Sequence, residues 1–121
     1  PLPKTQMGGE IYPEGLAKFL IRNAQEYTGD TPLIVTENGM ASANEHADPD
    51  RIAYLEAHLN AVLRAIGEGV PVAGYYIWSL LDNYEWALGY EKRFGLVHVD
   101  FDTLARTPKA SYEAVQSALA R

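Results

Sequence analysis

The chain opens with a stretch in which apolar residues recur at the three- and four-residue spacing of a helix. Residues at this spacing lie on one face of a helix, so the stripe is expected to face a core. Pro13 suits a first helical turn, and Gly29 follows the last apolar position. The pattern predicts a helix between these two residues. The apolar positions are Leu16, Phe19, Leu20, Ala24 and Tyr27.

A longer stripe with the same spacing lies in the middle of the chain. Asp48 is suited to cap the start of this second helix, with Pro49 in its first position. Gly67 and Gly69 are suited to end it. The stripe consists of Ile52, Leu55, Leu59, Val62, Leu63 and Ile66.

A third helix is predicted near the end of the chain. Thr107 and Pro108 are suited to start it, and three later apolar residues would share one face: Tyr112, Val115 and Leu119. Just before this helix, apolar and polar residues alternate, which is typical of one exposed strand or a hairpin arm. The alternating residues are Val97, His98, Val99, Asp100, Phe101 and Asp102.

Two short apolar runs lie between the helices. Residues 33–36 predict one buried strand, and the aromatic-rich run 72–78 predicts a second strand, buried on both faces. The polar stretch 40–50 is expected to be a loop, and residues 79–95 show no clear period.

The alternation of helices with buried strands predicts an α/β fold with parallel crossovers. Buried parallel strands normally have neighbours on both sides, and this chain supplies only two such strands. The architecture is therefore expected to be incomplete, as a slice of a larger parallel sheet or barrel. In a barrel, functional residues gather where the strands end. Glu37 directly follows the first apolar run, and Trp78 ends the second, so both lie at carboxyl ends of predicted strands.

Composition narrows the class of partner. The 121 residues carry a net charge of −6, which disfavours nucleic acid or an anionic membrane as a partner. No apolar run approaches the roughly 20 residues of a membrane helix. The N-terminal residues do not resemble a signal peptide. The absence of cysteine excludes disulfides and thiolate sites, fits a reducing compartment and so favours the cytoplasm.

Glu37 is the first candidate for chemistry. A carboxylate at a strand end either caps the backbone and meets solvent, or acts as an acid, base or nucleophile at a barrel mouth. No serine, cysteine or histidine lies beside it in sequence to form a triad. Any reaction at this position would therefore be carboxylate chemistry.

The segment 75–95 is the second candidate, because it combines two Trp, four Tyr and one Phe with several carboxylates. Aromatic faces pack against the C–H faces of sugar rings, and carboxylates accept hydrogen bonds from hydroxyl pairs. The alternative is an aromatic-rich edge of the core. Glu85 directly before Trp86 favours binding, since one loop would have to satisfy both side chains.

The three histidines, His46, His58 and His98, have no metal-ligand spacing and are expected to be structural or solvated. No glycine-rich phosphate loop joins a strand to a helix. The sequence therefore predicts no metal and no nucleotide cofactor.

These segments together resemble glycoside hydrolase family 1, the β-glucosidase family. "VTENG" is similar to the family's nucleophile motif, and "WSLLDNYEWALGYEKRFGL" to its long sugar-binding signature. The resemblance implies that residues 1–121 are the C-terminal portion of a single (β/α)8 TIM-barrel domain, from about helix six to helix eight. On this view the chain is not a complete barrel by itself. Three further segments match in order: "EIYPEGL", "RIAYLEAHL" and "RTPKASY".

The resemblance also implies roles for five residues. Glu37 is similar to the catalytic nucleophile, and Trp78 to the platform under the non-reducing sugar. Glu85 resembles a carboxylate that accepts two sugar hydroxyls, and Trp86 an indole that donates to a neighbouring hydroxyl. Phe94 resembles an aromatic residue that closes the pocket.

The implied activity is hydrolysis of terminal, non-reducing β-D-glycosyl residues with retention. A carboxylate at Glu85 would repel a phosphate, so unphosphorylated glucosides, fucosides or galactosides are expected as substrates. The family's general acid/base Glu is not in these residues, which implies that the N-terminal part of the barrel, in the same polypeptide or a second chain, supplies it. Two other hypotheses stay open: a non-catalytic sugar-binding fragment, and a structural piece that complements a split barrel.

Overall fold

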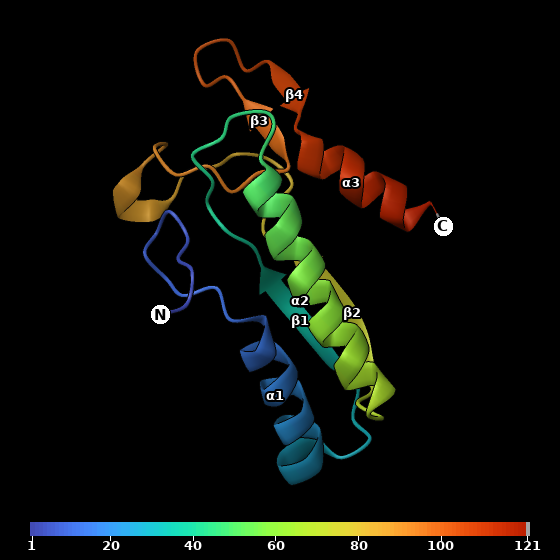
Figure 1. Ribbon diagram of the computed structural model, residues 1–121. Coiled ribbons are helices and arrows are strands. Elements are labelled where there is room, and N and C mark those ends of the chain that lie inside the picture. The colour runs from blue at the N-terminus through green and yellow to red at the C-terminus, as the bar shows by residue number, and fades with distance from the viewer. Residues whose placement is uncertain (121) are drawn as a thin grey trace.

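The computed structural model describes residues 1–120 and shows a partial α/β arrangement (Figure 1). Helices at the predicted places and two central strands are present, which confirms the main pattern read from the apolar spacing. The elements in chain order are α1 (Pro13–Asn23), the π-helical turn η1 (Ala24–Thr28), β1 (Leu33–Asn38), α2 (Pro49–Gly67), β2 (Val72–Ile77), the 3-10 turn η2 (Trp86–Leu88), β3 (Val97–Val99), β4 (Arg106–Pro108) and α3 (Ala110–Leu119).

Strands β1 and β2 pair in parallel, with α2 as the crossover between them (Figure 1). The register places Leu33 opposite Val72 and Val35 opposite Tyr75. Strand β1 extends through Asn38, two residues beyond the predicted end, so Glu37 lies within the strand. Parallel pairing brings the carboxyl ends of both strands to the same edge.

The hydrophobic core lies between this strand pair and the helices α1 and α2. Its buried members are Leu20 from α1, Val35 from β1, Val62 and Ala65 from α2, and Val70 from the turn that follows α2. Leu20, Val35 and Val62 come from a predicted stripe or apolar run, whereas Ala65 and Val70 were not among the predicted apolar positions. The apolar periodicity therefore identified the elements whose faces meet.

The expectation that β2 is buried on both faces is wrong for this chain. Tyr76 is 62% exposed, and Ile34 on the neighbouring strand is 53% exposed. Within residues 1–120 the sheet has two strands, and the helices cover only part of it. Side chains that a complete sheet would enclose therefore meet solvent here.

The predicted start of the last helix is also wrong. Thr107 and Pro108 belong to β4, which pairs antiparallel with β3, placing Thr107 opposite His98 and Pro108 opposite Val97. Because these two residues pair with β3, they cannot start the helix, and α3 begins at Ala110. The predicted alternating strand is thus the first arm of a hairpin.

Asp48 does not cap the helix it precedes with its side chain. Its carboxylate instead accepts hydrogen bonds from the Ser111 backbone N–H at 2.9 Å and the Ser111 hydroxyl at 2.6 Å, in the first turn of α3. The Arg51 guanidinium donates to the same carboxylate at 2.7 Å. Asp48 therefore joins the start of α2 to the start of α3, two segments far apart in sequence.

A second buried carboxylate, Asp82, organises the segment after β2. It accepts from Lys109 Nζ and Arg93 Nη1, each at 2.9 Å, and from the Gly95 N–H at 2.9 Å. Burial opposes ionisation, but these hydrogen bonds outweigh it and hold the pKa of Asp82 below its usual range. Ionised Asp82 therefore stabilises the folded state fully at pH values above the unfolded-state pKa of about 3.9. This contribution is lost as the pH falls from there through the lower pKa of the folded state.

Lys109→Met should lower the free energy of unfolding by about 3 kcal/mol, because removing one partner of a buried ion pair leaves a buried charge under-compensated. The measurement is urea unfolding of the complete protein at pH 7, followed by circular dichroism. Lys4→Met, at an exposed position, is the control and should change stability by less than about 0.5 kcal/mol. Equal losses in the two variants would contradict the role of the Asp82–Lys109 pair.

Candidate active site

The carboxyl ends of β1 and β2 are held close together. Trp78 donates its backbone N–H to the Asn38 carbonyl at 3.0 Å, and the Tyr75 hydroxyl donates to Asn38 Oδ1 at 2.6 Å. A side chain at Gly39 would collide with the carbonyl group of Trp78. The glycine after Asn38 is therefore a requirement of this close approach between the two strand ends.

A cleft of about 400 Å³ opens at this edge. It contains four of the five residues predicted from the sequence: Glu37 and Trp78 at the strand ends, and Glu85 and Phe94 from the irregular segment after β2. The structure thus brings together side chains that are up to 57 positions apart in the chain (Glu37 to Phe94). The complete set of residues lining the cleft is Glu37, Asn38, Gly39, Tyr54, Trp78, Glu85 and Phe94.

Glu37 is exposed to solvent on the wall of the cleft. Among residues 1–120, no hydrogen bond to its carboxylate is found, so a role in capping the strand end is not seen in this part of the chain. Strand β1 thus holds the Glu37 carboxylate at the edge of the cleft.

Trp86 is the predicted site residue that does not line the cleft. It starts the turn η2, where the Gly89 carbonyl accepts from the Glu85 N–H at 2.7 Å, and its side chain is 82% exposed. Trp78, by comparison, is 40% exposed. Within the described residues, the indole of Trp86 is therefore open to solvent and does not form part of the cleft.

Tyr54 of α2 lines the cleft and was not among the residues singled out from the sequence. Burial raises its pKa, partly offset by a hydrogen bond with Asn38, so it is a neutral phenol at pH 7. Its ring stacks on His58 at 3.9 Å between centroids, and His58 Nδ1 lies 2.8 Å from the Tyr54 carbonyl. Tyr54 lies outside the apolar stripe of α2, which was the one available sign that it faces something other than the core.

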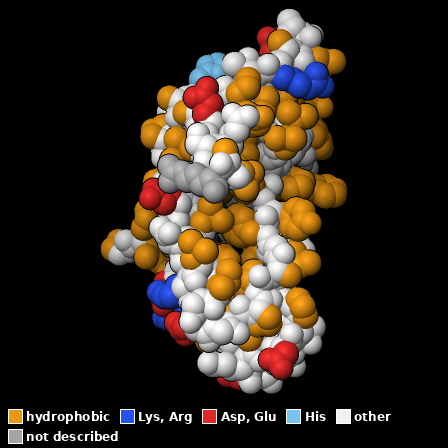
Figure 2. Space-filling model, turned by 90° about the vertical axis from the view of Figure 1, so that its right-hand side faces the viewer, with side chains coloured by type: hydrophobic (Ala, Val, Ile, Leu, Met, Phe, Trp, Pro, Cys, Tyr) orange, Lys and Arg blue, Asp and Glu red, His pale blue; other side chains and the backbone are white. Residues whose placement is uncertain are grey.

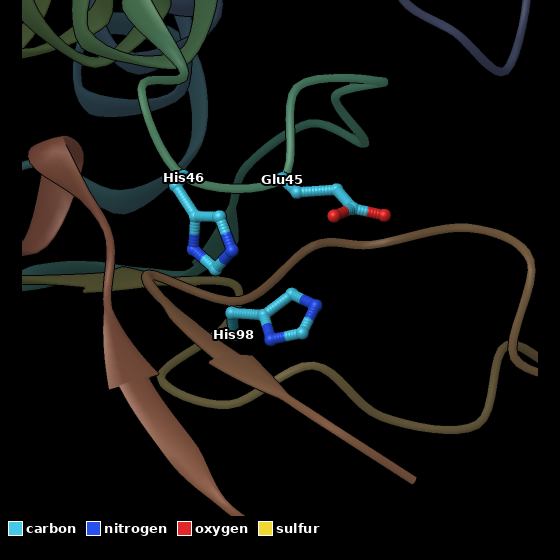
Figure 3. A group of neighbouring side chains, drawn as sticks. All are labelled: Glu45, His46 and His98. Carbon is cyan, nitrogen blue, oxygen red and sulfur yellow. The ribbon is translucent and has the colours of Figure 1, made fainter.

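Two histidines without any ligand spacing in sequence meet in space beside Glu45 (Figure 3). His46 and His98 have ring centroids 4.8 Å apart, and the possible donor atoms of all three residues lie within 4.8 Å of one another. Burial is the main cause of a lowered pKa at His98. The absence of a resident metal stays a prediction.

Comparison with known proteins identifies the chain's relatives. The family model "Glycosyl hydrolase family 1" matches residues 1–120. The chain belongs to glycosyl hydrolase family 1. It is 48% identical over 121 residues to a bifunctional β-D-glucosidase/β-D-fucosidase of Bifidobacterium breve, covering 92% of this chain and 26% of that protein. It is 49% identical to β-glucosidase A of Thermotoga maritima, covering 91% of this chain and 26% of that protein.

Solved structures of family 1 give the same result for the fold. The T. maritima family 1 β-glucosidase superposes with a TM-score of 0.92 at 46% identity, covering 98% of this chain and 28% of that one. A psychrophilic β-glucosidase from Micrococcus antarcticus also gives 0.92, at 49% identity, with 98% and 27% covered. This family 1 chain spans about a quarter of the length of these relatives, and its described residues form part of a TIM barrel without closing it.

Two further findings bear on the family 1 chain as a whole. Among residues 1–120, no helix has the length and apolar character needed to cross a bilayer. Another relative, 44% identical over 115 residues, is named a 6-phospho-β-galactosidase of Streptococcus mutans, and 25% of that protein is covered. Membership of the family therefore leaves the phosphorylation state of a substrate open.

Gly39→Ala should lower the free energy of unfolding by about 2 kcal/mol, because the new methyl group forces apart the ends of β1 and β2. Urea unfolding of the complete protein measures this loss. Gly67→Ala is the matched control, since a methyl group there meets no atom within 4 Å. It should be neutral or slightly stabilising. A neutral Gly39→Ala variant would show that the strand ends are not in close contact.

Proposed function

We propose that this chain is the part of a retaining β-glycosidase that supplies the catalytic nucleophile and part of the subsite for the non-reducing sugar. The observation that carries the proposal is the cleft at the carboxyl ends of β1 and β2, where Glu37, Trp78, Glu85 and Phe94 meet. Active sites of barrel enzymes lie at this end of the strands. The names of the family 1 relatives support the same class of activity.

Glu37 would act as the nucleophile. Its carboxylate attacks the anomeric carbon, the bond to the leaving-group oxygen breaks, and a glycosyl-enzyme ester forms. A second carboxyl group, about 5–5.5 Å away in retaining enzymes, protonates the leaving oxygen and later takes a proton from the attacking water. Water then releases the sugar with overall retention and regenerates the Glu37 carboxylate. The second carboxyl group would come from the N-terminal part of the barrel.

The remaining cleft residues suit the sugar. Trp78 offers an aromatic face for the C–H face of a pyranose ring, and Glu85 is an acceptor-only group for two hydroxyls. Trp86, a donor-only indole next to Glu85, would reach a neighbouring hydroxyl once the loop is enclosed by the rest of the barrel. The negative charge of Glu85 supports unphosphorylated β-glucosides, fucosides or galactosides over 6-phosphorylated sugars.

The N-terminal part of the barrel, in the same polypeptide or as a second chain, is the proposed partner of residues 1–121. Hydrophobic side chains gather over much of the face shown in Figure 2, and apolar surface of this extent is typical of an interface. Large apolar side chains more than half exposed in residues 1–120 include Phe19, Ile34, Leu63, Tyr76 and Leu80.

A cytoplasmic location stays a prediction that rests on the absence of cysteine.

Glu37→Gln should reduce kcat of the complete enzyme on an aryl β-glucoside by about 10⁴-fold or more, because an amide cannot form the glycosyl ester. Circular dichroism should show an unchanged fold. In the unaltered enzyme, a 2-deoxy-2-fluoro-glucoside should add one sugar mass to the peptide containing Glu37, detected by mass spectrometry. Near-normal turnover by the variant would exclude Glu37 as the nucleophile. Sugar binding without labelling or turnover would favour the non-catalytic alternative.

Glu85→Ser should lower kcat/KM for an unphosphorylated β-glucoside by about 100-fold, because hydrogen bonds to a charged acceptor are lost and such bonds strengthen in the transition state. Steady-state kinetics on the glucoside and its 6-phosphate measure the change in preference, which should shift toward the phosphate. Glu91→Ser is the control, since Glu91 is an exposed carboxylate of the same segment outside the cleft. An unaltered specificity constant in Glu85→Ser would remove Glu85 from the subsite.

A further inference from the structure

Arg51 is an almost fully buried cation close to the cleft but outside it. It lies in the first turn of α2 and is 2% exposed. Its guanidinium donates to the Asp48 carboxylate at 2.7 Å and to the Met40 carbonyl. It also donates to the carbonyls of Arg93 and Phe94, each at 2.9 Å. One side chain thus satisfies four acceptors from three segments.

Two of these segments are the walls of the cleft. The first wall carries Glu37 and Gly39 and continues directly into Met40, and the second carries Trp78 and Phe94. The walls also meet directly, because the Ser42 N–H donates to the Arg93 carbonyl at 3.2 Å. The Ser79 N–H donates to the Phe94 carbonyl at 3.2 Å, next to Trp78. The Arg51 guanidinium donates hydrogen bonds to both walls.

We propose that Arg51 is a positioning residue that sets the nucleophile, Glu37, relative to the sugar-binding wall formed by Trp78 and Phe94. This inference rests on the proposed function. A nucleophile must reach the anomeric carbon of a sugar whose place is fixed by the opposite wall, and a displacement of about 1 Å can cost about 100-fold in rate. Arg51 acts only through the backbone of the two walls.

The geometry requires arginine in particular. A guanidinium presents five N–H donors in a rigid plane, whereas an ammonium presents three on a flexible stem. The carboxylate of Asp48 compensates the buried charge and orients the plane, and Asp48 is itself held by Ser111 of α3. Lysine at this position keeps the charge but cannot reach Asp48, Phe94 and the two other carbonyls together.

The hydrophobic core lies elsewhere, so positioning and stability are separable. The core cluster is built on α1, β1, the middle of α2 and the turn after it, and includes Val62, which is 5% exposed. Val62→Ala therefore destabilises the same helix without altering either wall of the cleft. This variant is a matched control for any loss of stability in Arg51→Lys.

The experiment compares Arg51→Lys and Val62→Ala in the complete enzyme by the kinetics of inactivation with a 2-deoxy-2-fluoro-glucoside. Active sites are first titrated, so each rate refers to folded, competent molecules. Arg51→Lys should lower the inactivation rate constant by about 10- to 100-fold. The inactivator concentration at half-maximal rate should change by less than about threefold, since the sugar-binding side chains remain. Val62→Ala should leave both values unchanged per active site.

Equal rate constants per active site in Arg51→Lys and the unaltered enzyme would overturn the proposal and leave Arg51 a purely structural residue. If Arg51→Lys does not fold, Asp48→Asn serves instead. It retains an acceptor for Ser111 but removes the charge that orients the guanidinium, and it should lower the inactivation rate constant by at least threefold. An unchanged constant in that variant overturns the proposal equally. Failure of the proposed function would appear separately, as an unaltered enzyme whose Glu37 peptide is never labelled.

Discussion

Parallel pairing of β1 with β2 is the constraint on which the rest of this chain depends. The pairing requires a crossover, which α2 provides, and it places the carboxyl ends of both strands at one edge. The cleft of the candidate site lies at that edge. Glu37 is carried there by one strand, Trp78 by the other, and Gly39 is the residue that allows their backbones to approach closely.

Apolar packing stabilises the region around the middle of the strands, and buried ion pairs stabilise the region near the cleft. Around the middle of the strands, apolar side chains from α1, β1 and α2 form a small core. Near the cleft, buried ions replace that core: Asp48 binds Arg51 and Ser111, while Asp82 binds Lys109 and Arg93. Buried ion pairs contribute little net stability, but they tolerate few alternative arrangements once every group is paired. Such a network suits a region where loops, lacking regular hydrogen-bonded ladders, have to hold functional side chains in place.

The incomplete architecture and the proposed chemistry agree with each other. The chain spans about a quarter of its family 1 relatives and leaves strand faces exposed that a complete barrel would enclose. Under the proposed function, it likewise supplies one of the two carboxyl groups that retaining hydrolysis needs. The same division fits the exposure of Trp86, whose side chain is 82% exposed in the described part of the chain.

Features of the fold and site that depend on local residue spacing could be predicted from the sequence, whereas contacts between residues distant in the chain could not. Apolar spacing determined the helices, the two parallel strands and the incomplete α/β class, because those patterns record which face of each element is buried. The motifs around Glu37 and Glu85 likewise predicted four of the side chains that line the cleft. Tertiary structure alone decided that Thr107 and Pro108 join a hairpin, and that the Asp48 carboxylate binds Ser111 of α3 and Arg51 instead of capping α2. It also brought Tyr54 to the cleft and Arg51 between its walls. The contacts of Asp48 with Ser111 and of Arg51 with Phe94 join residues 63 and 43 positions apart. Local spacing carries no record of which distant backbone carbonyl or amide a polar side chain will meet.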